Sequence, residues 1–190
     1  NYIANYTWLI PRERADSKDG AAEAERARTR GLNWSPQRNT PCAVVTGFFM
    51  SPLGLPCTQP PFGKISAIDL TTRKLLWSRR LGSARDSGIF GVPLGLPIPM
   101  GVPNVGGAIT TASGLIFIAA TQERSIRAIG TRTGELLWSA RLPAGGHATP
   151  MTYESPQSGR QFVVIAAGGS RQLKSGSGDH IIAFSLPEQT

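Results

Sequence analysis

The stretch AIDLTTRKLLW (residues 67–77) returns later in the chain as AIGTRTGELLW (residues 128–138). Both copies begin with Ala-Ile and end with Leu-Leu-Trp, and a polar segment lies between the apolar ends. Two apolar segments joined by a few turn-forming residues predict two antiparallel strands and a tight turn. A unit of this kind that occurs twice indicates a repeat architecture.

Aligned column by column, the copies follow the pattern Ala-x-Asp-x-x-Thr-Gly-x-x-x-Trp. The small alanine leaves space for a ring, the Asp and Thr side chains hydrogen-bond the turn, and the glycine supplies a positive φ. The tryptophan buries a flat surface and directs its indole N–H towards a neighbouring unit. Arg73 replaces the glycine of the first copy, and Gly130 replaces the aspartate of the second. We interpret the motif as a structural docking device between units, made by Ala67, Trp77, Ala128 and Trp138.

Four short apolar segments separated by the turns SG, QERS and TRTG occupy roughly residues 106–140. They predict one complete four-stranded antiparallel sheet, with an incomplete or irregular unit before it and another after it. Such units, ending in a recurring tryptophan motif, indicate an all-β fold made of β-propeller blades. About three blades do not close a ring, so the chain either self-assembles or, as we favour, is a fragment of a longer polypeptide. We therefore predict one partial propeller domain over residues 1–190.

The remaining segments differ in composition. Residues 2–10 and 42–49 are predicted to be strands. Residues 11–41 are charged and Ala-rich, and we predict an insertion loop that holds a short surface helix near residues 20–30 or is mobile. The apolar content of this loop is too low for a core element. The segment 91–107 is rich in glycine and proline yet apolar, which predicts a loop that is buried or lines a site.

The net charge of +8 is spread along the chain, with acidic residues among the basic ones. A nucleic-acid-binding protein usually gathers its Lys and Arg side chains in one patch, so we expect no nucleic-acid partner. No apolar run approaches the roughly 20 residues of a membrane helix, and the first residues do not resemble a signal peptide. Cys42 and Cys57 fit neither a zinc nor a CxxC pattern, and the sequence leaves open whether they pair.

Five further stretches extend the repeat into a family resemblance. Together with the two motif copies, they resemble the C-terminal part of the membrane-bound glucose/quinate/shikimate dehydrogenases, eight-bladed quinoproteins that use pyrroloquinoline quinone (PQQ). The resemblance covers nearly the whole chain and is weakest over residues 12–40. The five stretches are SPLGLPC, PNVGGAITTASGLIFIAAT, RLPAGGHATPMTYE, FVVIAAGG and GDHIIAFSLP.

This resemblance implies an enzyme that oxidises a sugar or cyclitol alcohol at the periplasmic face of the bacterial inner membrane. PQQ would accept a hydride from the alcohol carbon with the help of a carboxylate base and a Ca²⁺ or Mg²⁺ ion, and electrons would pass to ubiquinone. The metal ligands, the catalytic base, the remaining propeller blades and the membrane anchor would all lie upstream of this chain. We therefore expect the isolated chain to be inactive.

The resemblance also points to residues near the chemistry. Asn5 matches a family asparagine that hydrogen-bonds PQQ, although an ordinary strand-end asparagine is an equal alternative. Asn104, Val105, Gly106 and Gly107 match a cofactor-binding loop in which a ring-stacking residue precedes a Gly-Gly pair; Val105 stands at the stacking position, which puts an aromatic sandwich in doubt. Glucose-oxidising members carry histidine after AAGG, near the substrate. Ser170 stands there instead, which weakens glucose as the substrate and leaves quinate, shikimate or another polyol open.

The two histidines carry no metal-ligand spacing. His147 lies where the family often has glutamine, and we interpret it as a polar loop residue; His180 leads the last strand and is interpreted as structural. A different class of function stays open beside the enzyme, namely a non-catalytic propeller module that binds a protein partner. Convergence of Asn5 and the 104–107 loop on one pocket would favour the enzyme.

Overall fold

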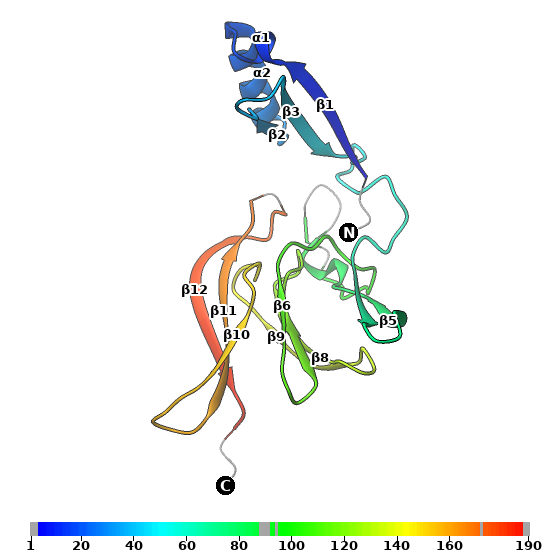
Figure 1. Ribbon diagram of the computed structural model, residues 1–190, viewed down its shortest axis with the longest axis vertical. Helices are drawn as coiled ribbons and strands as arrows, with labels where there is room; N and C mark the ends of the chain where they lie inside the picture. The colour runs from blue at the N-terminus through cyan, green and yellow to red at the C-terminus, as the bar shows by residue number, and fades with distance from the viewer. Residues whose placement is uncertain (1–3, 88–91, 94, 172, 188–190) are drawn as a thin grey trace. The chain divides into compact units, whose positions relative to one another are not determined.

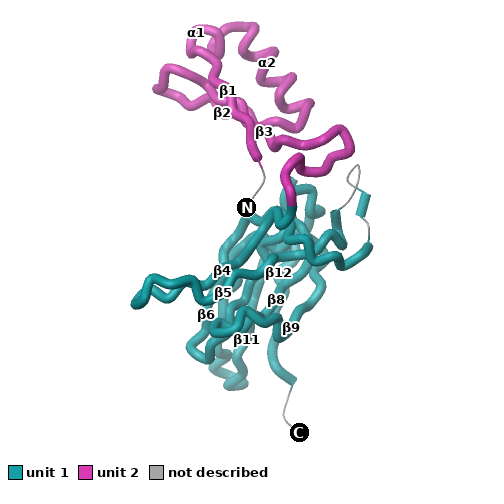
Figure 2. Tube along the Cα trace, turned by 90° about the vertical axis from the view of Figure 1, so that its right-hand side faces the viewer, with its two compact units in different colours: residues 1–2, 60–190 teal, residues 3–59 magenta. Residues whose placement is uncertain are grey.

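The computed structural model describes residues 4–87, 92–93, 95–171 and 173–187 (Figure 1). These residues fall into two compact units (Figure 2). The described residues up to 59 form one unit, and those from 60 onward form the other. The larger unit contains the two motif copies and is built from antiparallel sheets. The smaller one combines a sheet with helices.

The central sheet of the larger unit has four antiparallel strands in the order β6-β7-β8-β9. This is the predicted complete propeller blade, and the turns between its strands lie where the sequence places them. Residues of β8 are buried on both faces of the strand, since Ile126 belongs to one apolar cluster and Ile129 to another. The strands are β6 (Ala108–Thr110), β7 (Leu115–Ile118), β8 (Ser125–Gly130) and β9 (Leu136–Arg141).

Two smaller sheets belong to the same unit. The first motif copy forms an antiparallel pair of strands, β4 (Lys64–Asp69) and β5 (Lys74–Arg80), followed by a short 3-10 helix, η1 (Ala84–Asp86). The C-terminal strands form a sheet in the order β10-β11-β12. Their bounds are Met151–Glu154, Gln161–Gly169 and Ser177–Ser185.

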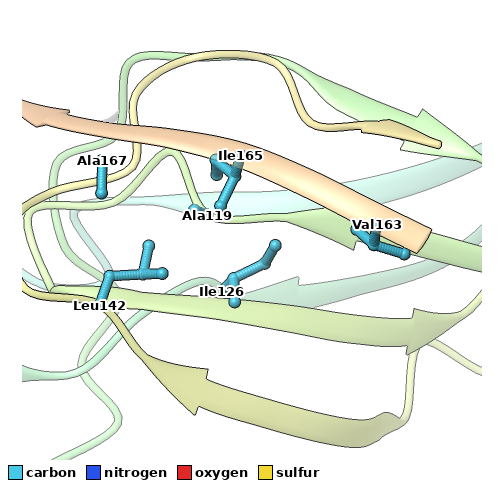
Figure 3. Packing of buried hydrophobic residues seen from close by; sticks show 6 residues of the cluster. All are labelled: Ala119, Ile126, Leu142, Val163, Ile165 and Ala167. Atoms are coloured by element: carbon cyan, nitrogen blue, oxygen red, sulfur yellow. The ribbon is translucent and has the colours of Figure 1, made fainter. Parts of the chain in front are cut away.

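Two apolar clusters hold these sheets together. Figure 3 shows Val163 and Ile165 of β11 facing Ile126 of β8 in the cluster between the central and C-terminal sheets. Ile126 and Ile165 are almost completely buried, and each such side chain contributes roughly 1.5–3 kcal/mol to folding. The other cluster lies between the β4-β5 sheet and the central sheet, and its members are Trp77, Leu81, Ile118, Ala120 and Ile129.

The tryptophan of the first motif copy docks on the turn of the second. The indole N–H of Trp77 donates to the carbonyl oxygen of Thr131 over 2.8 Å, and only 8% of the residue is exposed. A Cβ atom on Gly134 would lie 2.6 Å from the ring of Trp77, so only glycine lets the ring approach this closely. Gly134 also has a φ of +66°. The motif glycine therefore serves both the turn and the neighbouring tryptophan.

The turn of the first motif copy is stabilised by different residues. Asp69 Oδ1 accepts from the backbone N–H groups of Thr71 at 2.8 Å and Thr72 at 3.2 Å. Hydrogen bonds from Thr72 and Thr71 lower the pKa of the Asp69 carboxyl below its usual value. Arg73, at the glycine position, adopts a φ of +57°, which is unfavourable for a residue with a side chain. The two departures from the pattern thus leave both turns in the same overall form.

The smaller unit is built on strands β1 (Asn5–Pro11), β3 (Cys42–Phe48) and β2 (Asn33–Ser35), in the order β1-β3-β2. Two helices, α1 (Arg12–Ala15) and α2 (Lys18–Thr29), lie in the segment for which the sequence suggests an insertion loop.

The expectation that this segment makes no core element is wrong. Ala27 of α2 is 5% exposed and packs in a cluster with Ile10, Ala43 and Val45 of the sheet. A few alanines suffice because their small side chains bring the helix backbone close to the strands, while the arginines of α2 remain exposed. The Ser17 side chain accepts from the backbone N–H of Gly20 and caps the helix start.

Candidate functional site

Antiparallel pairing brings four loops to one end of the sheets in the larger unit. The starts of β6 and β8 and the ends of β7 and β9 lie at the same end of the central sheet, and the loop between β11 and β12 lies at the corresponding end of its neighbour. The opposite end carries the motif turns. Most of the residues that the sequence analysis connects with chemistry therefore lie at the loop end.

Backbone hydrogen bonds join these loops directly. Val105 donates to the carbonyl of Ala120 over 2.7 Å, and Ala120 donates to that of Gly146, also over 2.7 Å. Gly145 donates to the carbonyl of Ser175 over 2.9 Å. The loops before β6, after β7, before β10 and before β12 are thus one connected layer, and the two predicted site segments, 104–107 and Ser170, belong to it.

The Gly-Gly pair owes its identity to packing between loops. A Cβ atom on Gly106 would lie 2.6 Å from the backbone oxygen of His147, and one on Gly107 would lie 2.1 Å from Thr149 Oγ1. Gly106 also has a φ of +145°. Since both added Cβ atoms would meet protein atoms, these glycines let the 104–107 loop approach the loop after β9. Packing between these two loops therefore accounts for both glycines.

His147 connects the two predicted segments through its ring. Nδ1 lies 2.9 Å from the backbone oxygen of Val105, and Nε2 lies 2.7 Å from Ser175 Oγ. The backbone N–H of Ser170 donates to the same Ser175 hydroxyl over 2.9 Å. The sequence offered little sign of this role beyond the position of the histidine between Gly-Gly and Ala-Thr-Pro. His180, by contrast, is half-exposed and lies 3.7 Å from the exposed Asp179.

The described residues fit one side of a flat, carboxylate-rich cofactor such as PQQ. Val105 is 53% exposed, and its loop is fixed from beneath by hydrogen bonds, so its apolar side chain offers a contact for a planar ring. Asn104 pairs with Thr121 in an isolated β-bridge and brings an amide to the same loop. Val105 would contact such a cofactor, whereas the cofactor contact of Asn104 stays a prediction, because its side-chain nitrogen is buried near Gly63.

A cationic hollow lies close to this layer. Its volume is about 210 Å³, and it is lined by Asp86, Pro93, Arg124, Lys174, Ser175 and Gly176. Asp86 accepts two hydrogen bonds from Arg141, at 2.7 and 2.8 Å, and one from the backbone N–H of Arg124 at 2.8 Å. Burial alone would raise the pKa of Asp86, but these bonds and the nearby positive charges lower it below its usual value. Asp86 is therefore an ionised structural carboxylate.

The other buried carboxylate is also committed to structure. Glu123 and Arg127 form a buried ion pair, and Glu123 accepts from the backbone N–H of Ser83 over 2.9 Å. Burial lowers the pKa of the Arg127 guanidinium, and Glu123 opposes this shift. Both the arginine and the backbone of Ser83 therefore occupy the Glu123 carboxylate.

Among the described residues, no group of three or more His, Cys, Asp or Glu side chains could hold a metal ion. This part of the chain therefore does not fit a Ca²⁺ or Mg²⁺ site. Cys42 is half-buried, Cys57 is exposed, and both are free thiols. None of the helices in the described part of the chain has the length and apolar character needed to cross a membrane.

Asn5 belongs to the smaller unit, whereas the loop layer belongs to the larger one. It begins β1 of the smaller unit, is exposed, and pairs with Phe48 of β3. Its predicted contact with PQQ thus stays a prediction, separate from the residues that the larger unit brings together.

The sequence matches a protein family over residues 1–163. The family is described as "PQQ: Glucose/ethanol/alcohol dehydrogenase, beta-propeller domain". The chain belongs to this family. The propeller fold expected from the repeat is confirmed by this match and by the antiparallel sheets of the larger unit.

Two relatives cover almost the whole chain. A probable quinate dehydrogenase (quinone) of Xanthomonas campestris pv. juglandis is 46% identical over 181 residues, and a quinoprotein glucose dehydrogenase of Escherichia coli is 44% identical over 180 residues. Each alignment covers 95% of this chain and 22% of the relative. Among solved structures, the quinohemoprotein alcohol dehydrogenase of Comamonas testosteroni matches 76% of this chain and 20% of its own, with 26% identity and a TM-score of 0.44. The chain thus spans about a fifth of the length of these proteins.

Proposed function

We propose that this chain is the C-terminal part of a PQQ-dependent dehydrogenase that oxidises a sugar or cyclitol alcohol. The observation that carries the proposal is the loop layer. In a chain of the quinoprotein family, the candidate cofactor loop 104–107 and the candidate substrate-side residue Ser170 are joined through His147 and Ser175. A layer of this kind would bind the cofactor and orient it relative to the substrate.

The chemistry requires groups from the rest of the protein. PQQ, when bound, supplies the hydride acceptor. Asn104 and Val105 would orient it, and the base together with a Ca²⁺ or Mg²⁺ ion would come from other segments. Electrons would leave for ubiquinone at the periplasmic face of the inner membrane. Because the base and the metal are supplied elsewhere, we expect the 190-residue chain alone to show no turnover.

Ser170 favours a substrate other than glucose. The relatives named for quinate and for glucose are almost equally similar to this chain, so overall identity does not separate the two substrates. Ser170 is half-buried beside the loop layer, and its hydroxyl accepts from the backbone N–H of Leu173 at 3.3 Å. A small hydroxyl in place of an imidazole leaves more room and a different hydrogen-bonding partner, which suits quinate or shikimate.

The test reconstitutes the full-length protein with PQQ and either Ca²⁺ or Mg²⁺. Dye reduction is then followed with quinate, shikimate and glucose, while the quinone absorbance reports cofactor uptake. We expect uptake and faster turnover of the cyclitols, with Leu70→Gln, at an exposed turn position, as a control that behaves like the wild type. A folded protein that takes up no PQQ and oxidises none of the three would instead favour a propeller module that binds a partner.

A further inference from the structure

The His147 ring bonds the predicted site segment 104–107 directly and reaches the other predicted site residue, Ser170, through the hydroxyl of Ser175. Its two partners, Val105 and Ser175, are 42 and 28 residues away in the sequence. One lies in the loop before β6 and the other in the loop before β12. A single imidazole therefore spans the distance between two sheets.

The chemistry of the partners fixes the direction of each hydrogen bond. A carbonyl oxygen can only accept, so His147 Nδ1 must carry the proton that points at Val105. In a neutral ring Nε2 then has no proton, and it accepts from the hydroxyl of Ser175. The Ser175 oxygen keeps a lone pair for the backbone N–H of Ser170. With this arrangement, each donor in the chain of hydrogen bonds from Val105 through His147 and Ser175 to Ser170 has an acceptor.

The surrounding backbone leaves room for this one arrangement. A Cβ atom on Gly145 would lie 2.4 Å from Ser175 Oγ and 2.6 Å from His147 Nε2. Ser175 itself is only 3% exposed, and its backbone is bonded to Gly145 and Ser170. The His147 ring is therefore held against buried, hydrogen-bonded backbone rather than against a loose surface loop.

We propose that His147 is a positioning residue of the cofactor site. Through its Nδ1–H group and its Nε2 atom, it positions the Val105 loop, on which PQQ would rest, and the Ser170 backbone, which would face the substrate. This inference rests on the proposed function. It makes the spacing between the two segments depend on one side chain that does not itself touch cofactor or substrate.

The same reasoning identifies the conservative replacement. A glutamine amide also presents one donor and one acceptor, so His147→Gln can bond the Val105 carbonyl and accept from Ser175. His147→Leu keeps the bulk of the side chain and loses both bonds. Ser175→Ala removes only the hydrogen bonds that the Ser175 hydroxyl makes to His147 Nε2 and to the backbone N–H of Ser170. The matched control is His180→Leu, which alters the other histidine of the chain at an exposed site.

The first readout is hydrogen–deuterium exchange of the full-length protein without cofactor, in peptides covering residues 103–107 and 168–176. We expect His147→Leu to raise exchange in both peptides, Ser175→Ala to raise it mainly in 168–176, and His147→Gln and His180→Leu to match the wild type. If His147→Leu does not fold, the test compares the exchange of Ser175→Ala with that of the wild type. Wild-type exchange in both peptides for His147→Leu, or in 168–176 for Ser175→Ala, would overturn the inference.

The second readout is PQQ titration of the apoprotein, with kcat and KM of the loaded enzyme. Two lost hydrogen bonds should weaken PQQ binding roughly tenfold in His147→Leu, and His147→Gln should recover most of it. A wild-type protein that binds no PQQ refutes the proposed function and the cofactor role of His147 with it. Normal PQQ uptake by the wild type together with equal affinity in His147→Leu refutes the role of His147 alone.

Discussion

The larger unit contains two interfaces between sheets, and the same motif serves them differently. At the first interface, between the β4-β5 sheet and the central sheet, Trp77 is buried and hydrogen-bonded to the turn at Thr131. At the second, between the central and C-terminal sheets, Trp138 is 39% exposed, and its ring lies edge-on to that of Phe184, with 5.1 Å between the ring centroids. The second interface depends instead on aliphatic side chains of β8 and β11.

This difference shows that the burial of a docking tryptophan depends on the turn that the neighbouring sheet presents to it. Trp77 finds Gly134 and the Thr131 carbonyl in the turn of the next sheet. The next sheet after Trp138 has three strands and offers no second motif turn within its described residues. The motif sequence alone therefore does not determine how much of its tryptophan is buried.

The largest expected effect is loss of the docked ring. Trp77→Ala removes the buried indole and leaves the Thr131 carbonyl without its donor, so we expect the free energy of unfolding to fall by about 3–5 kcal/mol. Trp138→Ala should cost at most about half as much, since its ring is already partly in water. Thermal unfolding of the full-length variants measures both. Equal losses would mean that another part of the protein covers Trp138.

The fold was largely predictable because the repeat is local. Alternating strands and the turns around Gly114 and Gly134 are encoded by neighbouring residues, and their positions follow from the sequence. A helix near residues 20–30 was one of the two predicted alternatives for the charged segment, but the burial of Lys18–Thr29 against a sheet was not predicted, because the alanines that make this contact look like surface residues in the sequence alone.

The candidate site was predictable only in part. The resemblance identified the segments 104–107 and Ser170, and the strand order explains why they share one end of the sheets. The hydrogen bond between His147 and Ser175 was missed, since it joins residues 28 positions apart and leaves no local pattern in the sequence. The reason for the Gly106-Gly107 pair was also missed, because it depends on the tertiary approach of His147 and Thr149.

A smaller effect should follow from the turn that receives Trp77. Gly134→Ala forces an alanine into a φ of +66° and places its Cβ 2.6 Å from the indole ring. The conformational cost of about 1 kcal/mol and the clash together should lower stability by about 2 kcal/mol. Gly159→Ala is the matched control, because its φ is +63° and no atom lies within 4 Å of the added Cβ. A loss for Gly134→Ala no larger than that of Gly159→Ala would contradict the docking role.

The ion pairs of Asp86 make the first interface sensitive to acid. The folded pKa of Asp86 is lowered, so its stabilising effect is present above the unfolded pKa of about 3.9 and is lost as the pH falls through the folded pKa. Asp86→Asn should cost about 1 kcal/mol at pH 7, because partly exposed Arg141 is the main partner. We expect the difference in melting temperature between wild type and variant to narrow below about pH 4. A difference that stays constant down to pH 3 would rule out this source of stability.

The smallest effect concerns the strained position of the first turn. Arg73→Gly relieves a φ of +57°, which costs about 1–2 kcal/mol for an L-residue, but the glycine also gains about 0.4–1 kcal/mol of freedom in the unfolded chain. The relief is the larger of the two terms, so we expect a net stabilisation of about 0.5 kcal/mol, visible as a slightly higher melting temperature. Arg73→Ala is the control, since it removes the charge and keeps the strain. If Arg73→Ala stabilises as much as Arg73→Gly, the cause is the loss of a positive charge rather than the release of the backbone, and the two motif turns are then equivalent in strain despite their different residues.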